Sequence, residues 1–347
     1  MKYFFTKEDT VATKGFAIFL LLFHHLFYEN PEFSVNVMGV NIFNKLALAS
    51  KVTVAIFIIL SGYGLAESVK NKKLEILNFY IKRFSKLFVT YWVIFLIFVP
   101  IGVFIFGRSI QSVYGNHAIV KLIIEFFGLQ EYVFGHGYNP TWWFMSAIIA
   151  LYAVFPFLYY LIKRFPVIIF IALTLLLFTS FPEHEWYLPF GVGILLSVHL
   201  TSELKTKITQ FLFNKTLIAI PVIIGLIVTI VFLRFYHQPF SGVRIDSLFG
   251  LLLISLNWIF VKKWNFLNKV LVSFGKVSME IFLFHTFIFY YFFKDFIYSL
   301  KNPILMFIVL ASVCWVIGIV LNKLCSRIYS FLSTYAIRKS TVNNANY

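Results

Sequence analysis

Charged side chains are scarce in this sequence, and acidic ones are the scarcest. Charged residues make up 13% of the 347-residue chain, with 14 aspartates and glutamates against 30 lysines and arginines, whereas hydrophobic residues make up 60%. This composition excludes an ordinary soluble globular protein, in which about a quarter of the residues are charged. Long apolar runs recur from one end of the chain to the other, which indicates a membrane protein.

Cysteine is nearly absent as well, because the chain contains only Cys314 and Cys325. Both lie in or just after the last apolar run, without a second pair at metal-binding spacing and without a base nearby in sequence. We expect both side chains to pack between helices, and we predict no metal site.

The sequence also lacks alternating strand patterns, low-complexity linkers, shifts in composition and a convincing internal repeat. Lipid offers the backbone no hydrogen-bond partner, so a membrane protein without strand patterns must be a helical bundle. We therefore predict an all-α fold with one integral membrane domain over 1–347 and no appended soluble domain. Ten segments are predicted to be transmembrane helices, of which the fifth and sixth are short: 11–28, 47–66, 84–106, 142–161, 166–181, 186–200, 217–236, 246–261, 278–293 and 303–321.

The net charge of +16 is distributed unevenly along the chain. If the N-terminus is cytoplasmic, most of the 30 lysines and arginines fall at the cytoplasmic ends of the predicted helices, as the positive-inside rule requires. This distribution explains the excess of basic residues without a nucleic acid partner. It also predicts that both termini are cytoplasmic. We expect a multi-pass protein of the bacterial plasma membrane, in contact with membrane lipid.

Three polar residues stand out inside the first apolar segment: Lys14, His24 and His25. Lys14 and His25 are eleven residues apart, about 20° from three whole helical turns, so they share one face about 16 Å apart along the axis. His24 is rotated off that line by about 80°. A neutral imidazole at this depth can act as a general base. The alternative is a histidine that hydrogen-bonds between helices, with Lys14 reaching to the membrane surface.

Two further polar groups lie in the third and ninth predicted helices. Arg83 and Lys86 are neighbours on one face at the cytoplasmic boundary, where they can bind a polyanionic ligand or, alternatively, anionic lipid headgroups. In the ninth helix Ser278 and His285 share a face, and Glu280 lies about 140° round from His285. Such a polar ladder serves either chemistry or hydrogen bonding between helices.

Five elements in this order resemble the membrane-bound acyltransferase family three, whose members acylate surface polysaccharides and some small molecules. The resemblance covers nearly the whole chain. The family's motifs correspond here to Lys14, Gly15, Ala17 and His25 in the first helix, Ser61, Gly62 and Tyr63 in the second, Arg83 and Lys86 in the third, Trp143 through Pro156 in the fourth, and Gly275, Ser278, Met279, Phe282, Leu283 and His285 in the ninth.

The sequence departs from the family pattern at several positions. Lys14 and Lys86 replace arginines, which keeps the charge but loses the planar, two-pronged hold on phosphate. Met279 and Phe282 replace tyrosines, so no role for those hydroxyls carries over. Isoleucines occupy 148–149, where many members have a carboxylate in the fourth helix. These departures suggest a divergent branch of the family.

The resemblance implies an O-acyltransferase that moves an acetyl group from cytoplasmic acetyl-CoA to a hydroxyl of an extracytoplasmic or lipid-linked surface polysaccharide. His25 is assigned as the general base that takes the proton from the attacking hydroxyl. The CoA phosphates are assigned to three basic residues: Lys14, Arg83 and Lys86. Supporting catalytic roles, in stabilising the oxyanion or orienting the base, are assigned to three residues: Ser278, Glu280 and His285.

The segment 134–144, FGHGYNPTWWF, offers aromatic faces and polar groups of the kind that stack on sugars. We assign Trp142 and Trp143, together with His24, to substrate binding; an aromatic belt at the membrane surface is the alternative for the tryptophans. The preceding segment is predicted to form an interfacial amphipathic helix with five apolar residues on one side: Ile119, Leu122, Ile123, Phe126 and Phe127.

A secondary transporter or flippase of a sugar-containing substrate is the alternative function, because transporters also keep polar residues at the membrane midplane. Transporters of this size usually contain an internal repeat, which is not found in this sequence. A structural or sensory membrane protein is a third possibility. It predicts that Lys14, His25 and Arg83 tolerate replacement by alanine.

Overall fold

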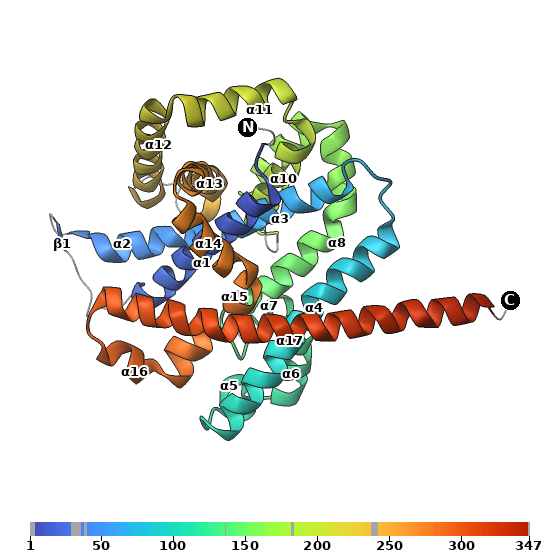
Figure 1. The fold of residues 1–347 in the computed structure, drawn as a ribbon. Helices are drawn as coiled ribbons and strands as arrows, with labels where there is room; N and C mark the ends of the chain where they lie inside the picture. Colours follow the sequence, from blue (N-terminus) through green and yellow to red (C-terminus); the bar gives the residue numbers. More distant parts are fainter. Residues whose placement is uncertain are drawn as a thin grey trace. The chain divides into compact units, whose positions relative to one another are not determined.

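The computed structural model describes residues 4–28, 36–37, 40–135, 137–181, 184–236 and 242–345. The predicted all-α fold is confirmed, since helices account for most of these residues (Figure 1). A single antiparallel pair of two-residue strands, β1 (Asn36–Val37) and β2 (Val40–Asn41), is the exception within the described ranges.

The chain folds into two compact units, each built from segments that are distant in sequence. The first unit comprises Met1–Leu74 and Ala150–Ser278, and the second comprises Glu75–Ile149 and Met279–Tyr347. Helix α8 (Trp143–Arg164) therefore begins in the second unit and continues in the first. A single domain over the whole chain stays a prediction.

The remaining helices of the first unit are, in chain order, α1 (Lys7–Phe27), α2 (Ile42–Ala49), η1 (Ser50–Val52), α3 (Thr53–Val69), α9 (Pro166–Leu176), α10 (His184–His199), α11 (Ser202–Thr209), η2 (Gln210–Asn214), α12 (Thr216–Tyr236), η3 (Gly242–Ile245), α13 (Asp246–Lys263) and α14 (Asn265–Lys276). Those of the second unit are α4 (Ile76–Phe104), α5 (Ile110–Tyr114), α6 (Ala118–Phe126), α7 (Gln130–Val133), α15 (Ser278–Thr286), η4 (Phe287–Phe292), α16 (Lys294–Ser299) and α17 (Pro303–Ala345), of which α15 begins at the last residue of the first unit. The segments η2 and η4 are π-helical.

Seven helices among the described residues are long and apolar enough to cross a membrane, and up to nine spans result if each of two bent pairs counts as one. The first pair is α10 and α11, between which the chain bends by 108°, and the second is α14 and α15. Helix α9 has 11 residues, about 16 Å, which is roughly half the thickness of a hydrocarbon core. The predicted count of ten is therefore not confirmed, and the cytoplasmic position of both termini stays a prediction.

Glycines form the closest helix crossings of the first unit. A Cβ atom added at Gly15 of α1 would collide with the carbonyl of Leu271 in α14, and one at Gly275 would collide with the carbonyl of Val11. Gly62 of α3 meets the backbone of α10 in the same way. Small residues let membrane helices approach closely, and packing is what drives their association in lipid. Three glycines of the family-like motifs therefore have a packing role.

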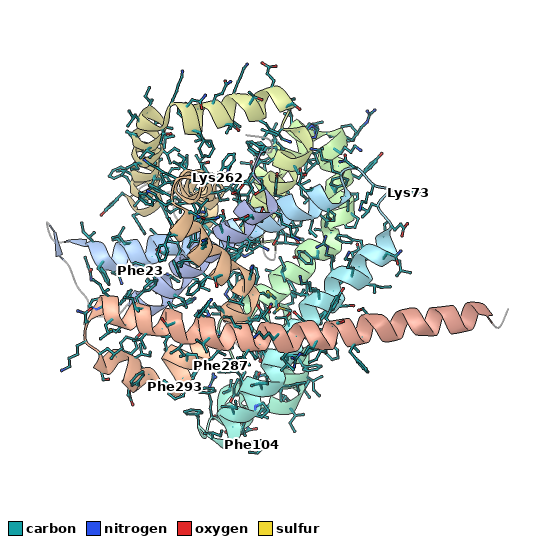
Figure 2. The ribbon with its side chains drawn as sticks, viewed as in Figure 1. Phe23, Lys73, Phe104, Lys262, Phe287 and Phe293 are labelled. Atoms are coloured by element: carbon teal, nitrogen blue, oxygen red, sulfur yellow. The ribbon has the colours of Figure 1, made fainter. Side chains whose placement is uncertain are left out.

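Two ion pairs hold buried carboxylates of the first unit. Asp9 closes a capping box with Thr6 at the start of α1, and its carboxylate lies 2.6 Å from the ammonium of Lys262 in α13, which is labelled in Figure 2. Arg234 of α12 pairs with Asp246 of α13, and both side chains are almost completely buried. A buried charge is tolerated when a partner compensates its lost hydration, so these pairs have a structural explanation.

An aromatic core fills the second unit around Phe287 of η4, labelled in Figure 2. The ring centroid of Phe98 lies 5.0 Å from that of Phe287 and 5.3 Å from that of Phe284. Trp142 adds its indole 5.7 Å from Phe287. These stacked and tilted rings bury large apolar surfaces and position the segment before α8 against α15.

Candidate active site

Helix α1 carries the first group of predicted site residues. It is continuous from Lys7 to Phe27, so Lys14 and His25 lie three turns apart on one line, as predicted. Both side chains are partly exposed, whereas Ile18 and Leu22 between them are completely buried. The interval between the lysine and the histidine is thus filled by packed apolar side chains.

His24 is buried beside His25 and has a defined orientation. Its Nδ1 lies 2.7 Å from the carbonyl oxygen of Ala47 in α2. A carbonyl only accepts hydrogen bonds, so Nδ1 carries a proton and a neutral His24 has its lone pair on Nε2. The His24 ring stacks on Tyr28 at 5.2 Å and meets the His25 ring edge-on at 4.8 Å. The neighbouring ring therefore restricts the orientation of His25.

The second group of predicted residues lines a polar cavity within the second unit. This cavity has a volume of about 180 Å³ and lies between α4, α15 and α17. Glu280 of α15 is 3% exposed, and its Oε1 accepts a hydrogen bond of 2.8 Å from Nδ2 of Asn322. The exposed Lys86 of α4 lines the same cavity. Eight residues line it in all: Lys86, Val89, Thr90, Glu280, Asn322, Cys325, Ser326 and Tyr329.

Three of these cavity residues were missed in the sequence. Asn322, Ser326 and Tyr329 follow one another at spacings of four and three residues, which places them on one face of α17. The predicted last span ended at residue 321, where the apolar run ends, but the helix continues to Ala345. The helical spacing of these polar residues was a signal that could have revealed them.

The cavity offers an ammonium, a carboxylate, an amide and hydroxyl groups within one small volume. Such a lining suits a polar ligand with an anionic group, since the lysine can pair with the anion and the neutral groups can donate and accept hydrogen bonds. Within the described part of the chain, no three His, Cys, Asp or Glu side chains gather to hold a metal ion.

The three basic residues assigned to the phosphates are divided between the units. Arg83 and Lys86 lie one turn apart on α4, and the guanidinium carbon of Arg83 is 6.0 Å from the centre of the Phe79 ring. Lys14 belongs to the other unit. The structure therefore brings Arg83 and Lys86 together, and the joint role of all three stays a prediction.

His285 and Ser278 are both buried in α15. Nδ1 of His285 lies 3.0 Å from the carbonyl oxygens of Ile281 and Phe282, so it donates to the backbone of its own helix. The imidazole also stacks on Phe289, with 6.1 Å between ring centroids. These contacts fix the ring inside the core of the second unit.

The two predicted sugar-stacking tryptophans differ in their surroundings. Trp142 is completely buried, and its Nε1–H donates a hydrogen bond of 2.8 Å to the carbonyl of Leu283. Trp143 is partly exposed at the start of α8. Asn139 also donates to the carbonyl of Leu283, at 3.1 Å, so the segment 134–144 is tied to α15. Within that segment, His136 lies outside the described residues.

Helix α6 contains a buried acid that the sequence did not reveal. Ile119 and Ile123 are 70% and 52% exposed, so the predicted apolar face points outward, whereas Glu125 on the other side is completely buried. Its carboxylate accepts hydrogen bonds from the hydroxyl of Tyr114 and, at 2.8 Å, from the backbone N–H of Tyr138. Burial raises the pKa of Glu125 to about 8, although hydrogen bonding from the backbone of Tyr138 and Asn139 and the nearby Arg108 oppose the rise.

Comparison with known proteins identifies the family of the chain. A family model described as an acyltransferase domain matches residues 12–322. Acyltransferase MdmB of Streptomyces mycarofaciens is 31% identical over 120 residues, which is 33% of this chain and 30% of the relative's length. No solved structure matches the chain. Because the family model covers most of the sequence, the chain belongs to this family of multi-pass membrane acyltransferases.

Proposed function

We propose that this acyltransferase moves an acetyl group from cytoplasmic acetyl-CoA to a hydroxyl of a surface polysaccharide, or of its lipid-linked precursor, in the bacterial plasma membrane. One observation carries the proposal: a continuous α1 helix holds Lys14 and His25 on one line, both partly exposed, with His24 fixed beside His25. Ionisable side chains in a membrane helix are costly, and a partly exposed histidine with a restricted ring is suited to proton transfer.

The reaction is a transesterification from sulfur to oxygen. His25 accepts the proton of the acceptor hydroxyl while the hydroxyl oxygen attacks the carbonyl carbon of the acetyl group. The tetrahedral intermediate then collapses, the carbon–sulfur bond breaks, and the new ester stays on the acceptor. The proton held by His25 passes to the departing CoA thiolate, so the base is restored. Bringing donor and acceptor together in line supplies much of the rate enhancement.

Basic residues at the predicted cytoplasmic ends of the helices are proposed to bind the phosphates of the donor. Arg83 and Lys86 lie one turn apart on α4, and Lys86 lines the polar cavity of the second unit. The cavity groups Asn322 and Ser326 suit the amides of the pantetheine arm, because each can exchange hydrogen bonds with an amide. Lys14 of α1 is also proposed to bind the phosphates of the donor.

The acceptor side and the supporting catalytic groups are also proposals. Trp143, which is partly exposed, offers a face for a sugar, with Trp142 supporting the same segment from the core. His24 is proposed to contact the acceptor while it orients His25. The role of stabilising the oxyanion or orienting the base is proposed for three buried residues of α15: Ser278, Glu280 and His285.

The test is the ester-linked acetate of surface glycans, released by mild base from cells without the protein and from cells that produce defined variants. We expect His25→Ala to reduce the acetate to the level of the cells without the protein, because loss of a general base lowers a rate by about 10²–10⁴-fold. The matched control is His184→Ala, a partly exposed histidine at the start of α10, which should retain wild-type acetate.

Membrane levels of each variant are compared by immunoblot, so that a missing protein is not mistaken for a missing base. Acetate at the wild-type level in His25→Ala cells would overturn the catalytic assignment. Acetate that is equal with and without the wild-type protein would instead point to the transporter alternative, since a transporter does not change acetyl content.

A further inference from the structure

An apolar cavity of about 200 Å³ lies within the first unit, separate from the residues assigned to acyl transfer. Its walls come from the segment before α1, from α3, from α10 and α11, from η2 and from α13. Thirteen residues line it: Phe4, Phe5, Ile59, Leu60, Tyr63, Leu196, Leu200, Ile208, Leu212, Leu251, Ile254, Ser255 and Trp258. An aliphatic chain suits such a lining, because almost every wall is hydrocarbon or an aromatic ring.

Trp258 in the wall of this cavity has a polar atom without a partner. The residue is 3% exposed, and its indole N–H has no hydrogen-bond acceptor among the described residues. A buried donor normally finds an acceptor, so the exception needs an explanation. A ligand that carries an oxygen acceptor beside an aliphatic chain would supply the missing partner.

Three phenylalanines pack against this indole, Phe4, Phe5 and Phe213, and the first two also line the cavity. Phe4 and Phe5 meet the Trp258 ring edge-on, with centroids 5.1 and 5.4 Å away. Phe5 has a φ of 28°, a positive value that costs conformational energy for a residue with a side chain. A segment with a strained backbone at a cavity wall can lower its conformational energy by moving. Displacement of Phe4 and Phe5 would enlarge the cavity beside the indole.

The rim of the cavity carries a positive charge. The Lys205 ammonium of α11 lies 5.8 Å from the centre of the Phe4 ring, and Lys205 makes no ion pair within the described part of the chain. Lys207 on the same helix differs, because it pairs with Glu203 at 2.6 Å. An anionic group above Phe4 would therefore meet an available cation.

Lipid is the most accessible source of a suitable ligand here. Helix α12, which follows η2 directly, exposes apolar side chains along its length, and Leu217 at its start is 93% exposed. Phe211 of η2 is exposed as well. In a membrane these surfaces face acyl chains, so phospholipid lies beside the elements that form the cavity wall.

We propose that this cavity binds one acyl chain of an anionic phospholipid. The chain lies between α3 and α13, Phe4 and Phe5 move aside, and the ester carbonyl accepts the hydrogen bond of the Trp258 indole. The phosphate pairs with Lys205. Binding would hold the start of α1 in one position, which links lipid composition to the helix that carries His25.

Fluorescence quenching tests the proposal, with Trp258 as its own reporter. The full-length protein in mild detergent is titrated with phosphatidylglycerol carrying brominated acyl chains, and in parallel with phosphatidylcholine carrying the same chains. The Trp258 emission is the difference between the wild type and Trp258→Phe. We expect phosphatidylglycerol to quench this component at lower concentration than phosphatidylcholine does.

Two pairs of variants separate the chain from the headgroup. Ser255→Phe fills the cavity and should abolish quenching of Trp258, whereas Ser299→Phe, at an exposed serine in α16, should not. Lys205→Gln should raise the phosphatidylglycerol concentration for half-quenching about two- to fivefold, whereas Lys207→Gln leaves it unchanged.

Trp258 emission that no brominated lipid quenches would overturn the proposal, even if Ser255→Phe fails to fold. Equal quenching by both lipids would overturn the proposed preference for an anionic headgroup. An unchanged titration in Lys205→Gln would overturn it as well. Loss of acetyl transfer is not a readout of this experiment, so its outcome is independent of the proposed reaction.

Discussion

The buried carboxylates of the two units have different kinds of partner. In the first unit each of two buried carboxylates belongs to an ion pair, Asp9 with Lys262 and Asp246 with Arg234, although Oδ2 of Asp246 has no hydrogen-bond partner among the described residues. In the second unit Glu280 faces a cavity. Glu125, also in that unit, is buried with an Oε1 that has no hydrogen-bond partner among the described residues.

This difference separates polar residues that stabilise a membrane fold from those that are open to a ligand. Removing a charge from water costs several kcal/mol unless a partner compensates, so a buried ion pair is explained by the fold alone. A polar group that lines a cavity can obtain its remaining partners from a bound molecule. The role of a polar residue in an apolar run can therefore be assigned only when its ion-pair or hydrogen-bond partner is known.

The largest expected effect is on the stability of the first unit. Arg234→Met leaves Asp246 as an unpaired buried charge, which should cost about 3–5 kcal/mol and lower the Tm strongly. The control is Lys207→Met, which breaks the exposed pair with Glu203 and should cost less than about 1 kcal/mol. Thermal unfolding in detergent measures the Tm of both variants. Equal decreases in Tm would show that the buried ion pair contributes no more to stability than the exposed one.

The buried Glu125 should make the stability of the second unit depend on pH. Its folded-state pKa of about 8 lies above the ordinary 4.5, so the folded state holds a proton that the unfolded state has released. This contribution is fully present below pH 4.5 and is lost as pH rises through about 8. We expect the Tm to fall over that range in the wild type and to fall less in Glu125→Gln. Parallel curves for the two proteins would show that Glu125 is ionised in the fold.

A smaller effect is expected at the crossing of α3 and α10. Gly62→Leu places side-chain atoms against the Phe190 carbonyl and should cost about 1–3 kcal/mol. Gly64→Leu is the matched control, because an added Cβ at Gly64 meets nothing within 4 Å. The same thermal unfolding assay compares them. Tolerance of both leucines would mean that Gly62 has another role than packing.

The smallest effect is expected in the polar cavity, and on donor binding rather than on stability. Lys86→Gln removes the ammonium at the cavity and should raise the KM for acetyl-CoA roughly three- to tenfold, with little change in Tm. Lys82→Gln, an exposed lysine one turn earlier on α4, should leave the KM within about twofold. A lower Tm in Lys86→Gln with an unchanged KM would place Lys86 among the structural groups.

Much of the fold could be predicted because apolar length determines what crosses a membrane. All seven continuous candidate spans overlap predicted segments. The bends could not be predicted from hydropathy, although Thr201, which caps α11 through the backbone N–H of Leu204, marks the first of them. The amphipathic helix α14 before the second bend contributes too few consecutive apolar residues to resemble a span.

The site was only partly predictable, for two physical reasons. Hydropathy shows where contact with lipid ends and not where a helix ends, so Asn322 and its neighbours on α17 were missed. Glu125 was missed because its partners, Tyr114 and Tyr138, come from different parts of the chain and meet it only in the folded unit. Lys86 and Glu280 were recognised because each interrupts an apolar helix.

The most direct test of the account is acetyl transfer by the purified protein in lipid nanodiscs, with radiolabelled acetyl-CoA and a chemically deacetylated glycan as acceptor. The label that enters the glycan is measured for the wild type and for His25→Ala at equal donor occupancy. The account predicts transfer by the wild type and about 1% of that rate or less for His25→Ala. An undiminished rate in His25→Ala would contradict the assignment of His25 as the base.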